Sequence, residues 1–287
     1  MMLRSKALFP LSLILALAAG CDQQQPGDPL VRTPIRTGAA DTATPSQQSS
    51  PNESRVQVES SCRPVIFENT SFTHCLAVPA RHTIRTAWRG SDDQPLRSFA
   101  RYAANAGDAA ASVAFAFNAG MFDEDGQPIG YFVEDGERLH TLNTGTGEGD
   151  FYAKPNGVFF GTDDQWQIMT SDAFLKTVSE RPKFGTQSGP MLVIEGRLHP
   201  DIAPDGDDRV FRNAVGVDAN GRAHFVISNA PVSFGKLARL YRDKLEVGDA
   251  LHLDAKVSSL WSPANGRMDD ASPLGPLIIV DRRANTE

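Results

Sequence analysis

Residues 22–57 form a tract of Gln, Pro, Ser, Thr, Asp and Gly with few large apolar side chains. Such a segment buries too little apolar surface to offset the conformational entropy that folding removes. We therefore expect a disordered tether, which as a flexible coil would reach on the order of 30 Å. A hydrophobic core must then come from residues 59–287, which are enough for one large domain or two closely packed lobes.

An apolar run precedes the tether. Arg4 and Lys6 form a short basic region before Ala7–Ala19, which is too short for a comfortable membrane span. The run leads to Leu17-Ala18-Ala19-Gly20-Cys21, which resembles a bacterial lipobox with its leucine one position further from the cysteine than usual. We predict a lipoprotein signal peptide at 1–20, a tether at 21–58 that starts at a lipidated Cys21, and a domain at 59–287. An ordinary cleaved signal is the alternative.

This layout predicts a membrane-anchored lipoprotein of the bacterial cell envelope, facing the periplasm or the exterior. With Cys21 assigned to lipid, Cys62 and Cys75 remain as a pair outside the cytosol. We predict a disulfide between them that stabilises the fold by roughly 3 kcal/mol. A metal site is the weaker alternative, because His74 is the only nearby soft ligand.

The formal charge of −7, without a basic stripe, argues against nucleic acid as a partner. Two acidic turns at 123–126 and 205–208 lack the complete twelve-residue calcium loop, so we expect solvated loops there. No metal ligand and no cofactor is predicted, and the question of a divalent cation stays open.

The apolar pattern predicts more strand than helix. Strands are expected at 113–117, 130–134, 157–161, 166–169, 191–195, 213–218, 223–228, 250–254 and 277–280. Helices are expected at 95–104, 172–179 and 234–245, the last with Ser233 as its N-cap. The predicted fold class is α+β (mixed α/β), a strand-rich mixed sheet with few flanking helices.

The strand at 250–254 ends in an acid. Alternation places Ala250, His252 and Asp254 on one face and the two leucines on the other. The preceding strand at 223–228 and helix at 234–245 complete a plausible right-handed β-α-β unit, so Asp254 would lie at the carboxyl end of a strand. A buried carboxylate must be paired or used. The alternatives are an ordinary strand-end acid for Asp254 and a satisfied core histidine for His252.

Five segments occur in a characteristic order. They are FNAGMF at 117–122, KPNGVF at 154–159, TQSGPMLV at 186–193, FRNAVGV at 211–217 and LHLD at 251–254. Together they resemble the phosphodiester glycosidase family, to which the enzyme that uncovers mannose 6-phosphate belongs. The resemblance covers roughly residues 114–280. It implies an enzyme that cleaves the bond between a sugar and a phosphate, with a phosphosugar or glycoconjugate as substrate.

The chemistry of this reaction suggests roles for individual residues. A phosphate monoester leaves readily, so the site needs donors that hold phosphate and one carboxylate that activates water, unlike ordinary glycoside cleavage. We predict Asp254 as the base or nucleophile, Arg212 as the phosphate ligand and His252 as a group that tunes or relays the proton. The predicted substrate-binding residues are Asn118, Gly120, Lys154, Asn156, Gln187, Ser188, Gly189, Asn213 and Lys256.

Structural alternatives exist for several of these residues. Arg212 could pair at the surface with an acid of the 205–208 turn, and Lys154 could face solvent. Asn118 and Asn156 could be turn residues that bond their own backbone. Ser188 invites an esterase interpretation, but the glycines around it are misplaced for a nucleophile elbow.

The sequence departs from the family at one point. The family usually continues the last motif with one or two glycines, whereas here Ala255 and Lys256 follow Asp254. These residues indicate either a loop reshaped for a different, anionic substrate or impaired catalysis. The second functional hypothesis is therefore a non-catalytic envelope protein that binds carbohydrate or phosphosugar on the same fold.

Overall fold

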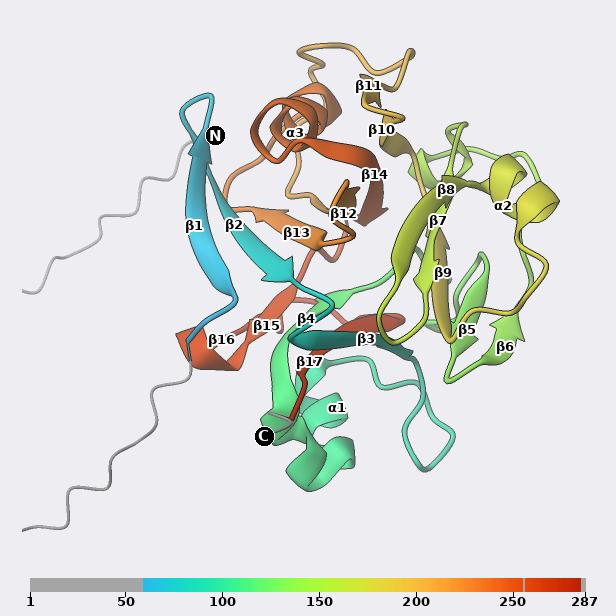
Figure 1. Ribbon diagram of the computed structural model, residues 1–287, viewed down its shortest axis with the longest axis vertical. Helices are drawn as coiled ribbons and strands as arrows, with labels where there is room; N and C mark the ends of the chain where they lie inside the picture. The colour runs from blue at the N-terminus through green and yellow to red at the C-terminus, as the bar shows by residue number, and fades with distance from the viewer. Residues whose placement is uncertain (1–58, 255, 285–287) are drawn as a thin grey trace, which may run out of the picture. The chain divides into compact units, whose positions relative to one another are not determined.

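The computed structural model describes residues 59–254 and 256–284 (Figure 1). The predicted signal peptide, lipidated Cys21 and tether lie outside these residues. Within the described part of the chain, no helix is long and apolar enough to cross a membrane.

The described strands form three sheets, and every strand pairing in them is antiparallel. The first sheet has the order β1(Cys62–Phe67), β2(Thr70–Ala77), β13(Ala223–Ser228), β12(Asn213–Asp218), β14(Val247–Asp254), β10(Met191–Ile194) and β11(Arg197–Leu198). The second has the order β16(Arg267–Met268), β15(Leu260–Ser262), β4(Val113–Asn118), β17(Leu277–Arg282) and β3(His82–Ala87). The third has the order β6(Glu137–His140), β5(Phe132–Glu134), β9(Phe184–Ser188), β7(Gly157–Gly161) and β8(Trp166–Thr170).

Helices are few and short. The α-helices are α1(Phe99–Ala106), α2(Ser171–Thr177) and α3(Phe234–Arg239), and a π-helical turn at Leu240–Lys244 extends α3. Ser233 caps α3 as predicted, since its side chain accepts a hydrogen bond from the Lys236 N–H at 3.2 Å. The strand-rich class with few helices is confirmed, but the expected mixed sheet is wrong, because the chain forms three antiparallel sheets.

The predicted β-α-β unit is wrong in one respect. Both β13 and β14 run antiparallel to β12, so they are parallel to each other and α3 connects them, but β12 lies between them. The tight turn at Asn220-Gly221 pairs β12 with β13 and thereby occupies that edge of β13. As a result Asp254, the last residue of β14, lies opposite Asn213, the first residue of β12.

The three sheets share one apolar core. The ring of Phe225 on β13 lies 5.4 Å from those of Phe115 and Phe117 on β4 and 5.8 Å from that of Phe159 on β7. Separate apolar clusters lie under α3 and under α1. In Figure 1, α3 covers the first sheet at the top and α1 lies beside β3, β4 and β17 at the bottom. Because the core joins elements of all three sheets, the strand ends that surround it are held in place.

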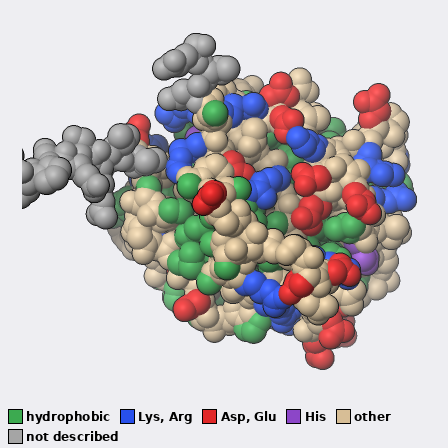
Figure 2. Space-filling model, turned by 90° about the horizontal axis from the view of Figure 1, so that it is seen from below, with side chains coloured by type: hydrophobic (Ala, Val, Ile, Leu, Met, Phe, Trp, Pro, Cys, Tyr) green, Lys and Arg blue, Asp and Glu red, His purple; other side chains and the backbone are tan. Residues whose placement is uncertain are grey.

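The predicted disulfide is confirmed. Cys62 and Cys75 lie opposite each other in the β1–β2 pair and form a disulfide across 13 positions of sequence. This bond ties the first described strand to its neighbour. Figure 2 shows acidic and basic side chains interspersed over one face of the molecule.

Candidate active site

Two asparagine side chains connect the ends of three strands. Asn213 Oδ1 accepts a hydrogen bond from the Asp254 N–H at 3.0 Å, and Asn213 Nδ2 donates to Asn118 Oδ1 at 2.8 Å. Asn118 Oδ1 also accepts from the Ser259 N–H at 2.8 Å. Asn118 ends β4, so it is a link between the sheets rather than a turn residue bonded to its own backbone. This link holds the end of β14, with Asp254, in a defined position.

Asp254 is nearly buried, with 4% of its surface exposed. Its Oδ1 accepts hydrogen bonds from the N–H groups of Lys256 at 2.5 Å and Val257 at 2.9 Å. Burial raises the pKa of this carboxyl, and the two N–H donors counter that effect. The two contacts of Oδ1 are those of the strand-end turn alternative, and they leave Oδ2 without a hydrogen bond from the described residues.

Arg212 is fully buried next to this strand end. Its guanidinium lies 3.5 Å from the centre of the Phe234 ring, its Nε donates to the Val232 carbonyl at 3.1 Å, and its Nη2 donates to Asp208 at 2.6 Å. The alternative pairing with an acid of the 205–208 turn is thus real, but Arg212 itself is buried and not at the surface. Its Nη1 makes no hydrogen bond to the described residues, and it lies 3.5 Å from Asp150 Oδ2. This buried nitrogen can still donate a hydrogen bond, and an anionic ligand would accept it.

Asp150 belongs to the site and was missed in the sequence. It begins a 3₁₀ turn at Asp150–Tyr152, and its side chain is 36% exposed. Burial raises its pKa, the neighbouring Arg212 lowers it, and Asp208 raises it further. Its charge also raises the pKa of Asp254, so the two carboxyls are electrostatically coupled. No motif marks Asp150, because GEGD at 147–150 is typical of an ordinary surface turn.

His252 is fully buried, and burial together with the charge of Arg212 lowers its pKa to about 3. The ring is therefore neutral near pH 7, and its Nδ1 donates to the Gly189 carbonyl at 3.0 Å. It packs edge-on against Phe234, with the ring centres 4.8 Å apart. Among the described residues, no hydrogen bond joins it to the Asp254 carboxylate. Its Nε2 is buried without a hydrogen bond from the described residues, so the ring positions the Gly189 backbone but is not the fully satisfied core histidine of the alternative.

Gln187 and Ser188, at the end of β9, bond to protein groups. The Gln187 amide accepts from the N–H groups of Tyr131 and Asn143, both at 2.9 Å, and donates to the Asn143 carbonyl and to Ser171 Oγ. All its hydrogen-bonding positions are filled, which argues against the predicted substrate contact. Ser188 is fully buried and donates to the Leu253 carbonyl at 2.7 Å. Both residues hold loops and strands around the site.

The two predicted glycines are sites of close packing. A Cβ on Gly120 would lie 2.1 Å from the Gln187 carbonyl oxygen, and one on Gly189 would lie 2.8 Å from Asn156 Cβ. Asn156 is buried and donates to the Phe151 carbonyl at 2.9 Å. It thereby supports the turn that carries Asp150. These residues shape the backbone around the charged cluster.

The two predicted lysines differ in position. Lys154 is exposed and its Nζ donates to the Thr144 carbonyl at 3.1 Å, which fits the solvent-facing alternative. Lys256 is also exposed, but its charge lowers the pKa values of both Asp254 and Asp150. The structure thus brings together Asp254, Arg212, Asn213, Asn118 and Lys256 with the unpredicted Asp150.

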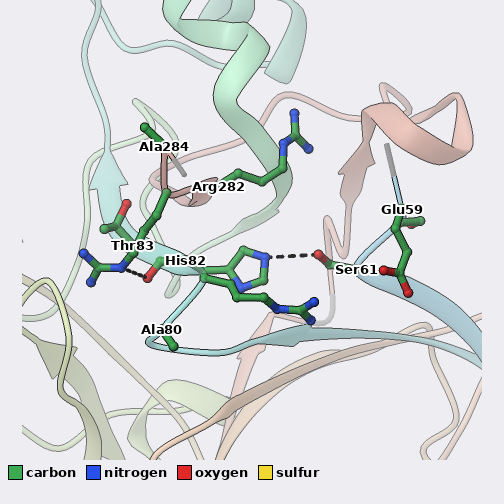
Figure 3. Close-up of a pocket in the computed structure, with 10 residues that line it drawn as sticks. Glu59, Ser61, Ala80, His82, Thr83, Arg282 and Ala284 are labelled. Carbon is green, nitrogen blue, oxygen red and sulfur yellow. Dashed lines mark hydrogen bonds between the residues drawn. The ribbon is translucent and has the colours of Figure 1, made fainter. Parts of the chain in front are cut away.

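A separate cleft of about 1020 Å³ contains another pair of reactive residue types, Ser61 and His82 (Figure 3). The Ser61 hydroxyl lies 3.2 Å from His82 Nε2. His82 Nδ1 accepts a hydrogen bond from the Val78 N–H at 3.0 Å, so the ring hydrogen must be on Nε2, which then donates to Ser61. Burial lowers the pKa of His82 to about 4. In this tautomer the histidine cannot take a proton from Ser61, and the pair is not a nucleophile with its base.

Comparison with known proteins identifies the family of this chain. Residues 111–280 match the family described as phosphodiester glycosidase. An uncharacterised protein of Escherichia coli (strain K12), YigE, is 35% identical over 171 residues, which are 60% of this chain and 66% of that protein.

Two solved structures match this chain, the first with a TM-score that indicates a shared fold. The zebrafish N-acetylglucosamine-1-phosphodiester alpha-N-acetylglucosaminidase catalytic domain, auto-inhibited by its pro-peptide, has a TM-score of 0.54 at 14% identity over 78% of this chain and 82% of that chain. A hypothetical protein from Synechocystis has a TM-score of 0.47 at 17% identity over 77% of this chain and 61% of its own. Asp150, Arg212 and Asp254 all lie within the matched stretch, and the chain belongs to the phosphodiester glycosidase family.

Proposed function

We propose that this protein is an envelope-anchored hydrolase that cleaves the sugar–phosphate bond of glycosyl-1-phosphodiesters. The observation that carries the proposal is the buried Arg212, whose Nη1 lacks a hydrogen-bond partner among the described residues and lies 3.5 Å from Asp150, a carboxyl whose charge in turn raises the pKa of Asp254. Perturbed carboxyls around a buried cation are typical of catalytic sites. Membership of the family supplies the reaction class.

In the proposed mechanism Arg212 Nη1 donates to a phosphate oxygen, with Lys256 adding positive charge from the rim. Asp254 Oδ2 takes a proton from a water molecule as that water attacks the anomeric carbon. The bond from this carbon to the phosphate oxygen breaks, and the electron pair stays on the departing phosphate monoester. The phosphate monoester leaves as an anion, and the proton on Asp254 passes to solvent; the charge of Asp150 raises the pKa of Asp254 and so makes it a stronger base.

Asn213 and Asn118 serve as positioning residues in this mechanism. Asn213 holds the backbone N–H of Asp254, and Asn118 holds Asn213. His252 and Ser188 support the adjoining backbone at Gly189 and Leu253. Removal of the Asn213 or Asn118 side chain should misplace Asp254 without removing a reacting group.

A second candidate is a non-catalytic phosphosugar-binding protein on the same fold. Its support is the Ala255-Lys256 pair, where the family usually has glycine after the aspartate. A lysine two residues after Asp254 favours an anionic ligand. In this case the Arg212 cluster binds phosphate but does not turn it over.

The decisive experiment incubates the protein with a panel of sugar-1-phosphodiesters and follows the release of free sugar. The variants Asp254→Asn and Ser188→Ala are measured beside the parent. Activity that is lost with Asp254→Asn and kept with Ser188→Ala supports the hydrolase. Saturable binding without turnover of any substrate would replace it with the binding protein, and ester cleavage lost only with Ser188→Ala would favour an esterase.

The envelope anchor is tested separately. The full chain should fractionate with membranes, and Cys21→Ser should release it. An unchanged distribution in that variant would contradict lipidation at Cys21, without bearing on the catalytic proposal.

A further inference from the structure

A cavity of about 430 Å³ lies apart from the Asp254 cluster, between β3, α1 and β5. We name it the Glu134 pocket. It lies at the end of the molecule that carries α1 in Figure 1. Its polar lining side chains are Arg85, Arg89, Tyr102, Asn105, Ser112, Glu134 and Asp281. None of these residues has a role in the proposed hydrolysis.

One wall of the pocket is preorganised by a partly buried ion pair. Arg85 Nε donates to Asp281 Oδ2 at 2.7 Å, and Asp281 Oδ1 accepts from the Ser112 hydroxyl at 2.8 Å. Arg85 Nη2 also donates to the Tyr102 hydroxyl. These contacts leave Arg85 Nη1 without a hydrogen bond to any described residue. The guanidinium is therefore held in place with a free donor.

Asn105 supplies a second free donor. Its Oδ1 accepts from the backbone N–H and the hydroxyl of Ser91, both at 2.9 Å. Because a backbone N–H can only donate, the acceptor atom is Oδ1 and the amide orientation is unambiguous. Its Nδ2 has no hydrogen-bond partner among residues 59–254 and 256–284.

Glu134 supplies the opposite charge. One of its oxygens accepts from the Trp88 N–H at 3.1 Å, and no Lys or Arg of the described residues forms a salt bridge with it. Arg85 and Arg89 pair instead with Asp281 and Asp93. Burial raises the pKa of Glu134 to about 7; the Trp88 N–H and the charge of Arg85 oppose this rise, and the acids Asp135 and Glu137 add to it. A carboxylate in this position gains most from a cation that enters from outside.

We propose that the Glu134 pocket binds a small zwitterion of amino-acid size, with its ammonium group on Glu134 and its carboxylate on Arg85 Nη1 and Asn105 Nδ2. The charges of the lining side chains balance, since two arginines face Glu134 and Asp281. A ligand with no net charge but two charged ends satisfies both the acceptor and the donors. The volume suits a small molecule rather than a polymer.

The test is isothermal titration calorimetry of the full-length protein with alanine, ethylamine and propionate. Alanine should bind in a saturable manner, ethylamine more weakly and propionate least. Glu134→Gln should weaken alanine binding by at least about tenfold, because a charge-assisted hydrogen bond is lost. Glu124→Gln, at an exposed glutamate outside the pocket lining, is the matched control and should bind like the parent protein.

Two further readouts separate binding from folding. Asn105→Asp should weaken alanine but not ethylamine, and thermal unfolding should show that every variant is folded. Alanine binding should release protons at pH 7 and weaken as the pH falls below 7, since a bound cation favours ionised Glu134. Absence of saturable alanine binding, or equal affinity in parent and Glu134→Gln, would overturn the proposal whether or not the protein hydrolyses phosphodiesters.

Discussion

Two regions of this molecule contain residues of catalytic type, and they differ in the direction of their hydrogen bonds. The Ser61–His82 cleft is roomy and pairs a hydroxyl with an imidazole. In the Asp254 cluster both Asp254 and the Arg212 guanidinium are buried, and the partly exposed Asp150 lies 3.5 Å from that guanidinium. In the cleft, a backbone donor on Nδ1 forces the histidine to donate to the serine. In the cluster, Asp254 and Arg212 keep one free acceptor and one free donor. Free hydrogen-bonding positions, rather than volume or residue type, mark the site.

The largest expected effect tests directly which of the two regions is the catalytic site. Asp254→Asn should lower the rate of sugar release by roughly 10²–10⁴-fold, because the amide cannot accept a proton from water. Ser61→Ala should leave the rate within about twofold of the parent, since Ser61 only accepts from His82. Steady-state kinetics on one phosphodiester measures both variants, with thermal unfolding as the check on folding. Equal losses in the two variants would contradict the assignment of the site.

Arg212→Lys tests whether phosphate binding needs the planar guanidinium of Arg212. Lysine keeps the charge but lacks the planar fork that bonds several partners at once, so kcat/KM should fall by about 10- to 100-fold. The matched control is Arg209→Lys, an exposed arginine three residues earlier that pairs with Asp205. If kcat/KM of Arg212→Lys equals that of Arg209→Lys, Arg212 does not bind phosphate.

The stability of the cleft region should depend on pH. His82 has a folded pKa of about 4, below its ordinary value near 6.5, so the folded state disfavours its protonation. Its contribution is complete above pH 6.5 and is lost as the pH falls from 6.5 towards 4, by on the order of 2 kcal/mol. Denaturant unfolding at pH 7 and pH 4.5 measures this change. His82→Asn, which keeps an acceptor for the Val78 N–H, should show a smaller loss, and an identical loss would assign the effect to other groups.

The smallest expected effect concerns the coupling inside the cluster. The Asp254 carboxyl must be ionised to act as a base, and burial raises its pKa, so activity should fall on acidification at a pH above the range of an ordinary aspartate. Asp150 contributes to that rise, and Asp150→Asn should therefore shift the acidic limb of the kcat/KM profile to lower pH. The measurement is the pH–rate profile of both proteins. A limb that stays in place would show that the two carboxyls act independently.

Sequence patterns predicted correctly those features that depend mainly on residues close together in the chain. The strands at 157–161, 213–218 and 223–228 appear with the predicted limits. Ser233 caps its helix, and Cys62 bonds Cys75, because both depend on residue type and near neighbours. The burial of Asp254 at a strand end also followed from alternation along one strand.

Sequence patterns did not predict features that depend on contacts between distant segments. Asp150 lies in a turn without a motif, and only the fold brings it within 3.5 Å of Arg212. Gln187 was predicted to bind substrate, but its side-chain amide forms hydrogen bonds with the backbone of Asn143 instead. The predicted order of strand, helix and strand was correct, but β12 lies between β13 and β14, the two strands that α3 connects. Each of these outcomes depends on contacts that no local pattern encodes.

The sequence by itself determined the family, the strand-rich class, the disulfide pair and the two central candidates, Asp254 and Arg212. These depend on residue types and on their order along the chain. Only the tertiary structure decided which of the predicted polar residues keep free donors and acceptors, because that depends on which partners the packing of three sheets brings within hydrogen-bond distance. It added Asp150 to the site, and it left Gln187 and Ser188 bonded to the protein.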